Sequence, residues 1–293
     1  MRPVSGDVLR DVPYGPAAAG NLLDLYPARG PAPAPLLVWS SGSGWMADNG
    51  KEGAAVIAPF FCGRGYAVAG VSIRSSAQAI YPAQLDDIKA AIRWLREHAG
   101  EHGVDPGRIA VMGNSSGGWF AVMAGLHADP PVQAVVDLYG PTDFLQMDEH
   151  MPEGGAEFKA FLGIERCHDD PGSPESRLVG GPILERREEC AAANPIAYVR
   201  PGAPPMLILH GQADPFVPHH QSELLFAALK VHRNEATFYS LPGVKHEHPY
   251  VTDPSLAEGF VVREARGGEE RVVEDAPPPT WETIERFLRG ALG

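Results

Sequence analysis

A serine lies between two glycines in the stretch Gly113-Asn114-Ser115-Ser116-Gly117, which follows the apolar run 108–112 and precedes the apolar run 119–126. The spacing Gly-x-Ser-x-Gly between a strand and a helix is typical of a nucleophile elbow, a turn too sharp for side chains at the glycine positions. We therefore expect Ser115 to be a nucleophile whose hydroxyl projects above a sheet. Ser116, at the start of the helix, would offer its backbone N–H to developing negative charge.

A serine hydroxyl needs a base, and the base needs a carboxylate that fixes its tautomer. On this kind of elbow the chain order is Ser, then Asp or Glu, then His. Asp214 follows the apolar run 206–210, on a loop at the end of a strand, where ligand sites of open parallel sheets form. His246 and His248 follow the next strand, and the residues alone leave either histidine possible as the base.

Elements that could position these residues alternate regularly along the chain. Strand-like apolar runs alternate with helix-length amphipathic segments, which predicts a mostly parallel sheet flanked by helices on both faces. We expect strands at 36–40, 66–73, 108–113, 134–140, 206–211 and 236–241. We expect covering helices at 85–99, where the apolar residues recur at helical spacing, and at 222–229 and 281–292.

Two stretches interrupt this alternation within what we expect to be a single domain, 1–293. The acid-rich stretch 148–190 has no strand period, and we interpret it as a cap-like insertion over the top of the sheet. A solvated loop without a role in catalysis is the alternative. The stretch 251–280 predicts an extra hairpin arm of two short strands joined at Gly267-Gly268. This arm is interpreted as a surface hairpin, an oligomer contact or part of the active site.

Most of the chain, apart from these two stretches, resembles the α/β-hydrolase superfamily. It is most similar to the esterase and lipase group related to hormone-sensitive lipase and to bacterial feruloyl and acetyl-xylan esterases. The segments that carry the resemblance are NLLDLYP (21–27), the stretch 81–118, NPIAYV (194–199), HGQADPFVP (210–218) and PGVKH (242–246). The resemblance implies the α/β-hydrolase fold. It also implies that the catalytic histidine closes a Gly-x-x-His pattern, which favours His246 over His248.

The family usually carries His-Gly-Gly-Gly and an aromatic residue after an early strand, where this chain has Ser41-Gly42-Ser43-Gly44-Trp45. Because an oxyanion hole consists of main-chain N–H groups, the resemblance implies Ser43, Gly44 and Ser116 as its donors. Serine tolerates a positive φ less readily than glycine, so we expect a differently shaped turn. Trp45 and Trp119 are candidate aromatic walls for an acyl or aryl group, with core packing as the alternative.

The resemblance implies a carboxylesterase that cleaves small acyl or aryl esters through an acyl-enzyme and needs no cofactor. The same residues could hydrolyse amides, formamides, lactones or peptides, or the scaffold could bind a small molecule without catalysis. His210 resembles a structural position of the family, and His219 and His220 begin a helix. Because no histidines have metal-ligand spacing, we predict no catalytic metal.

Composition narrows the partners and the location. A net charge of −13, from 24 basic and 37 acidic residues, would repel nucleic acid and anionic lipid. Three cysteines without C-x-x-C spacing indicate neither a disulfide framework nor a zinc cluster. No run approaches the roughly 18 apolar residues of a membrane span, and no apolar leader begins the chain, so we expect a cytoplasmic protein. A small-molecule ester is the expected partner, and a homodimer is left open.

Overall fold

The computed structural model describes residues 7–17, 19–256 and 259–293. Within these ranges one ten-stranded sheet has the order β1-β2-β4-β3-β5-β6-β7-β8-β9-β10. The strands are β1 (Leu9–Pro13), β2 (Leu22–Tyr26), β3 (Ala34–Ser40), β4 (Ala67–Val71), β5 (Val104–Asn114), β6 (Ala134–Leu138), β7 (Met206–Gly211), β8 (Ala236–Leu241), β9 (Phe260–Arg266) and β10 (Glu269–Ala276). Strands β4, β3, β5, β6, β7 and β8 are parallel, whereas the outer pairs are antiparallel.

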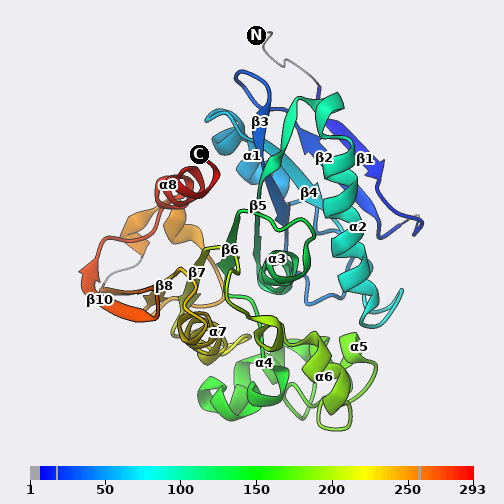
Figure 1. Ribbon diagram of the computed structural model, residues 1–293. Helices are drawn as coiled ribbons and strands as arrows, with labels where there is room; N and C mark the ends of the chain where they lie inside the picture. The colour runs from blue at the N-terminus through cyan, green and yellow to red at the C-terminus, as the bar shows by residue number, and fades with distance from the viewer. Residues whose placement is uncertain (1–6, 18, 257–258) are drawn as a thin grey trace.

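Helices cover both faces of this sheet (Figure 1). One apolar core holds the buried side chains of α2 (Ala83–Glu97), α3 (Ser116–His127) and α7 (His220–Val231). A second core, on the opposite face, holds those of α1 (Ala54–Cys62) and α8 (Trp281–Leu292). The expected mostly parallel sheet with flanking helices is therefore confirmed.

The expected strands correspond to β3 through β8, and the expected helices to α2, α7 and α8. β1, β2 and α1 were not among the elements expected from the sequence. β1 is an edge strand whose residues are mostly exposed, so it lacks the apolar pattern of a core strand. α1 is apolar on most of its faces and contains Pro59, which obscures the helical period.

Between β6 and β7 the chain forms short helices rather than strands. Three of them, α4 (Ala156–Leu162), α5 (Pro174–Val179) and α6 (Arg187–Ala193), lie together beside α3 and α7 (Figure 1). Further along, β9 and β10 are joined at Gly267-Gly268 and extend the sheet beyond β8. Residues 257 and 258, in the stretch 251–280, lie outside the described ranges. Residues 1–6, where the sequence was expected to show no apolar leader, also lie outside them.

Among the described helices, none combines the length and the apolar character that crossing a bilayer requires.

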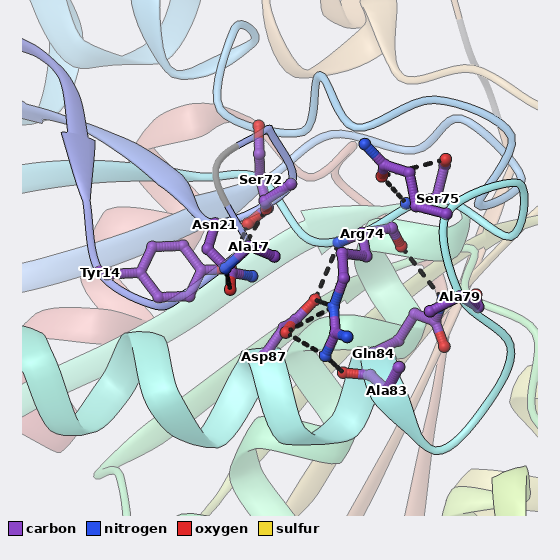
Figure 2. A network of polar contacts seen from close by, with 12 residues as sticks. Tyr14, Ala17, Asn21, Ser72, Arg74, Ser75, Ala79, Ala83, Gln84 and Asp87 are labelled. Carbon is purple, nitrogen blue, oxygen red and sulfur yellow. Dashed lines mark hydrogen bonds and ion pairs between the residues drawn. The ribbon is translucent and has the colours of Figure 1, made fainter.

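A network of polar contacts fixes the loop after β4 to α2 (Figure 2). The Arg74 guanidinium donates to both oxygens of Asp87, at 2.7 Å from Nη2 and 2.9 Å from Nε. The Arg74 backbone N–H also donates to Asp87, at 2.9 Å. In the same loop the Ser76 N–H donates to the Trp45 carbonyl at 2.7 Å, so this network supports the loop that carries Trp45.

Candidate active site

Ser115 occupies the sharp turn between β5 and α3. Its φ of 55° and ψ of −128° are rare for a residue with a side chain. A Cβ atom added to Gly113 would lie 2.2 Å from the Gly117 carbonyl oxygen, and one added to Gly117 would lie 2.0 Å from the Ser40 carbonyl oxygen. Because such distances are far inside van der Waals contact, only glycine fits at these two positions.

The loops after β5, β7 and β8 bring three of the expected residues together. His246 Nε2 lies 2.9 Å from Ser115 Oγ, and His246 Nδ1 lies 2.7 Å from Asp214 Oδ2. Both distances are within hydrogen-bond range, so the imidazole can accept the serine proton on one nitrogen while the other donates to the carboxylate. The three functional groups thus form a continuous hydrogen-bonded line.

Asp214 is buried, and both of its oxygens receive donors. Oδ1 accepts the N–H groups of Phe216 at 2.8 Å and Val217 at 2.9 Å. Burial alone would raise the pKa of Asp214, but the charge of His246 and the hydrogen bonds from His210 and His246 lower it well below its ordinary value. The carboxylate therefore stays ionised beside His246.

His210 lies behind Asp214 and not beside Ser115. Its Nε2 is 3.0 Å from the Val217 carbonyl and 3.3 Å from Asp214 Oδ2, and its Nδ1 is 2.7 Å from Ser222 Oγ. These contacts fix the loop that carries Asp214.

His248 has a different environment from His246. Its Nδ1 bonds the Tyr139 hydroxyl, which also accepts from Asn114 Nδ2 at 3.3 Å. Asn114 Oδ1 in turn accepts the Gly42 N–H at 3.2 Å, so the chain of hydrogen bonds ends at the loop after β3. Burial, together with the charge of His246, lowers the pKa of His248 to about 4. A neutral His248 accepts a hydrogen bond from the Tyr139 hydroxyl on Nδ1, so every hydrogen bond in this series has one donor and one acceptor.

Neither Tyr139 nor Asn114 was singled out in the sequence. The only signal was position: Asn114 precedes Ser115, and Tyr139 directly follows β6, the next strand of the parallel sheet.

The loop after β3 approaches the serine closely. A Cβ added to Gly42 would lie 2.4 Å from Ser115 Cβ, so glycine is required there. Positive φ values fall on Gly44, at 58°, and on Trp45, at 55°, and Ser43 has no positive φ. Ser43 therefore avoids the positive φ that serine tolerates poorly, and the residue with a side chain at positive φ in this turn is Trp45.

The three expected oxyanion donors differ in their hydrogen bonds. The Ser43 N–H donates to Ser116 Oγ at 3.0 Å. Among the described residues, the N–H groups of Gly44 and Ser116 have no protein acceptor. Gly44 and Ser116 thus offer free donors next to Ser115, whereas Ser43 becomes free only if the Ser116 hydroxyl turns away.

A cavity of about 340 Å³ opens beside Ser115 and His246. Its other walls come from the loop after β3, the loop after β7 and the segment between β6 and β7. These walls are mainly apolar, with Trp45, Met46, Pro141, Phe158, Phe161, Leu162, Pro174, Phe216 and Val217, and they include the carboxylate of Glu175. The stretch 148–190 was expected to form a cap-like insertion over the top of the sheet, but none of its residues was expected to line the site. The available signal was aromatic: Phe158 and Phe161 lie three residues apart in the acid-rich stretch, and Phe216 lies two residues after Asp214.

Trp45 and Trp119 have different positions relative to this cavity. Trp45 lines it, whereas Trp119 is fully buried and does not. The Trp119 indole N–H donates to the Ala193 carbonyl at 2.8 Å, and its ring meets Trp45 edge to face with centroids 5.4 Å apart. The expectation that Trp119 forms a pocket wall is therefore corrected: Trp119 supports Trp45 from behind, because α3 is buried on every side.

One group of side chains outside the cavity could share a metal ion: Asp148, Cys167 and His168. The Asp148 oxygens already accept the backbone N–H groups of His168, at 2.7 Å, and Asp169, at 3.3 Å. Both ring nitrogens of His168 also have protein partners. These contacts satisfy the polar atoms of Asp148 and His168 without an ion.

A mostly parallel sheet whose central strand ends at a strained serine elbow defines the α/β-hydrolase class. A solved esterase from the Planctomycetes species Thermogutta terrifontis shares this fold with a TM-score of 0.59, at 24% identity over 83% of this chain and 85% of that chain. Within the class, the chain belongs to the BD-FAE family, whose model matches residues 23–229. The resemblance to the esterase and lipase group is thereby confirmed.

Two relatives are more similar in sequence. Esterase LipQ of Mycobacterium tuberculosis is 32% identical over 252 residues, which cover 80% of this chain and 56% of LipQ. A truncated carbohydrate esterase from gut microbiota is 29% identical with a TM-score of 0.69, over 85% of this chain and 94% of that chain. The chain spans a little over half the length of LipQ and of the related mycobacterial proteins LipM and LipC.

Proposed function

We propose that this protein is a carboxylesterase that hydrolyses small esters through Ser115, His246 and Asp214. The observation that carries the proposal is the hydrogen-bonded line from Ser115 Oγ to His246 Nε2, 2.9 Å, and from His246 Nδ1 to Asp214 Oδ2, 2.7 Å, at one end of a cavity. A volume of about 340 Å³ suits a small substrate. The similarity to esterases LipQ and LipC and to LipM, a probable carboxylic ester hydrolase, supports ester hydrolysis as the reaction.

In the first half of the reaction Ser115 Oγ attacks the ester carbonyl carbon while its proton passes to His246 Nε2. The carbonyl oxygen becomes an oxyanion, which accepts hydrogen bonds from the N–H groups of Gly44 and Ser116. Ser43 joins them when the Ser116 hydroxyl rotates off its N–H. The intermediate collapses, the bond to the alcohol oxygen breaks, and the departing oxygen takes the proton from His246.

In the second half a water molecule attacks the acyl-enzyme and gives a proton to His246. Collapse of this intermediate breaks the bond to Ser115 Oγ, which takes the proton back as the carboxylic acid leaves. Asp214 stays ionised throughout because its pKa is lowered, and it stabilises the imidazolium in both halves.

A series of p-nitrophenyl esters of increasing acyl length tests the proposal. We expect wild-type protein to release p-nitrophenol with a preference for short chains, and Ser115→Ala to lose this activity. An anilide of the same acid should be cleaved far more slowly than the ester. A wild-type protein that cleaves the anilide but not the ester would contradict ester hydrolysis while keeping the same residues in use.

A further inference from the structure

Glu175 places a buried carboxylate in the wall of the otherwise mainly apolar cavity. The residue is 3% exposed and lines the same cavity as Ser115. It lies in the first turn of α5, directly after Pro174. A Cβ added to Gly44 would lie 3.0 Å from Pro174 Cβ, so the start of α5 packs against the expected oxyanion loop. Glu175 therefore lies close to where the ester carbonyl would be held.

His168 holds this carboxylate from behind. Its Nδ1 is 2.8 Å from Glu175 Oε2, its Nε2 is 3.3 Å from Met151 Sδ, and its ring stacks obliquely on Phe158 with centroids 4.2 Å apart. Because both ring nitrogens face acceptors, the ring is set up to donate from both. Burial alone would lower the pKa of His168, but the charge of Glu175 and hydrogen bonds with Cys167 and Glu175 raise it to about 10. The two side chains form an ion pair without net charge.

The second carboxylate oxygen, Oε1, is the one that the protein leaves open. Among the described residues no donor bonds it, whereas Oε2 bonds His168. Its surroundings in the cavity are largely apolar, with Phe158 and Phe161 among the walls. A carboxylate oxygen in such a place is costly unless a hydrogen-bond donor reaches it, and that donor must come from water or from the bound substrate.

We propose that Glu175 is a substrate-binding residue that accepts a hydrogen bond from a hydroxyl group of the ester, so that the preferred substrates are hydroxylated esters. The proposal rests on the ester hydrolysis proposed above. A hydroxyl group fits better than an ammonium group, because the pairing with His168 cancels the charge that would attract a cation. A site built to bond a substrate hydroxyl strongly disfavours an analogue that lacks it.

The hydroxyl group can belong to the alcohol or to the acyl part, and two matched substrate pairs separate these sources. The first pair is glycerol monobutyrate and propyl butyrate, and the second is methyl 3-hydroxybutyrate and methyl butyrate. We expect kcat/KM of the wild type to favour the hydroxylated member of one pair at least about tenfold. In Glu175→Gln that ratio should fall about fivefold or more, because a neutral hydrogen bond replaces a charge-assisted one. Glu185→Gln, the same change at an exposed position outside the cavity, should keep the wild-type ratio.

Three results would overturn the proposal: a wild-type ratio near one in both pairs, an unchanged ratio in Glu175→Gln, or a preference for butyrylcholine over its neutral isostere 3,3-dimethylbutyl butyrate without any preference for a hydroxyl group. If Glu175→Gln fails to fold, a wild-type ratio near one in both pairs still overturns the proposal. Hydrolysis of p-nitrophenyl butyrate keeps the two proposals apart. If the wild type cleaves this ester and the ratios are near one, only the proposed role of Glu175 is wrong. If the wild type cleaves no ester, both that role and the proposed ester hydrolysis are wrong.

Discussion

At the scale of single residues, the charge of Asp214, and not the size of its side chain, is the property that the proposed mechanism requires. Asp214→Asn keeps the size of the side chain, but it removes the charge that stabilises the imidazolium of His246 and allows the wrong tautomer. We expect kcat for p-nitrophenyl acetate to fall by on the order of 10⁴. Asp253→Asn, at an exposed turn position, should leave kcat unchanged. If kcat of Asp214→Asn stays within tenfold of the wild-type value, a group other than Asp214 stabilises the His246 imidazolium.

His248 gives a prediction about stability and pH. Its pKa is lowered to about 4 in the folded protein, below the ordinary value of 6.5, so between these values the unfolded chain binds the extra proton. The free energy of unfolding therefore falls as the pH drops through this window, and His248 contributes about 1–2 kcal/mol of the loss between pH 7 and pH 5. His248→Gln keeps an acceptor for Tyr139 and should lose correspondingly less stability over this range.

Urea unfolding of wild type and His248→Gln at both pH values measures this difference. His127 and His219, whose pKa values are also lowered to about 4, are present in both proteins and contribute equally to each. An identical pH dependence in the two proteins would contradict a neutral His248 in the folded state.

At the scale of elements, the turn from β5 to α3 tolerates no side chain at its glycines. Gly117→Ala places a Cβ 2.0 Å from the Ser40 carbonyl oxygen and should lower the free energy of unfolding by about 3 kcal/mol or more. Gly290→Ala is the matched control, because nothing lies within 4 Å of the added Cβ in α8. It should raise stability by up to about 1 kcal/mol, since alanine favours a helix. Thermal unfolding of both variants checks the opposite signs.

The helices between β6 and β7 show where element prediction from sequence ends. α4, α5 and α6 are short, six or seven residues each, so each offers less than two full turns of apolar period. Their positions depend on contacts with residues far along the chain. The Tyr81 N–H donates to the Leu178 carbonyl of α5, and the Trp119 indole N–H donates to the Ala193 carbonyl of α6, each at 2.8 Å. A sequence read locally predicts an insertion there but not which of its side chains reach the cavity.

At the scale of the whole molecule, the central strands could be predicted because both of their faces are buried, which makes them nearly continuous apolar runs. β1 could not be predicted, because its side chains are exposed at the sheet edge. Ser115, Asp214 and His246 could be located because each follows a central strand, and the carboxyl ends of parallel strands meet at one edge. Tyr139 bonds His248, which is distant in sequence, and Glu175 lies in a short helix of the insertion, so no local pattern marks either residue.

The central claim is that Ser115 is the reacting nucleophile of a hydrolase, and covalent labelling with a fluorophosphonate probe tests it most directly. The probe phosphonylates a serine only when a neighbouring base activates its hydroxyl. We expect wild-type protein to gain one probe group, mapped by peptide mass spectrometry to the peptide containing Ser115, and Ser115→Ala to gain none. Equal labelling of the Ser115→Ala variant, or a wild-type protein that stays unlabelled while folded, would contradict the account.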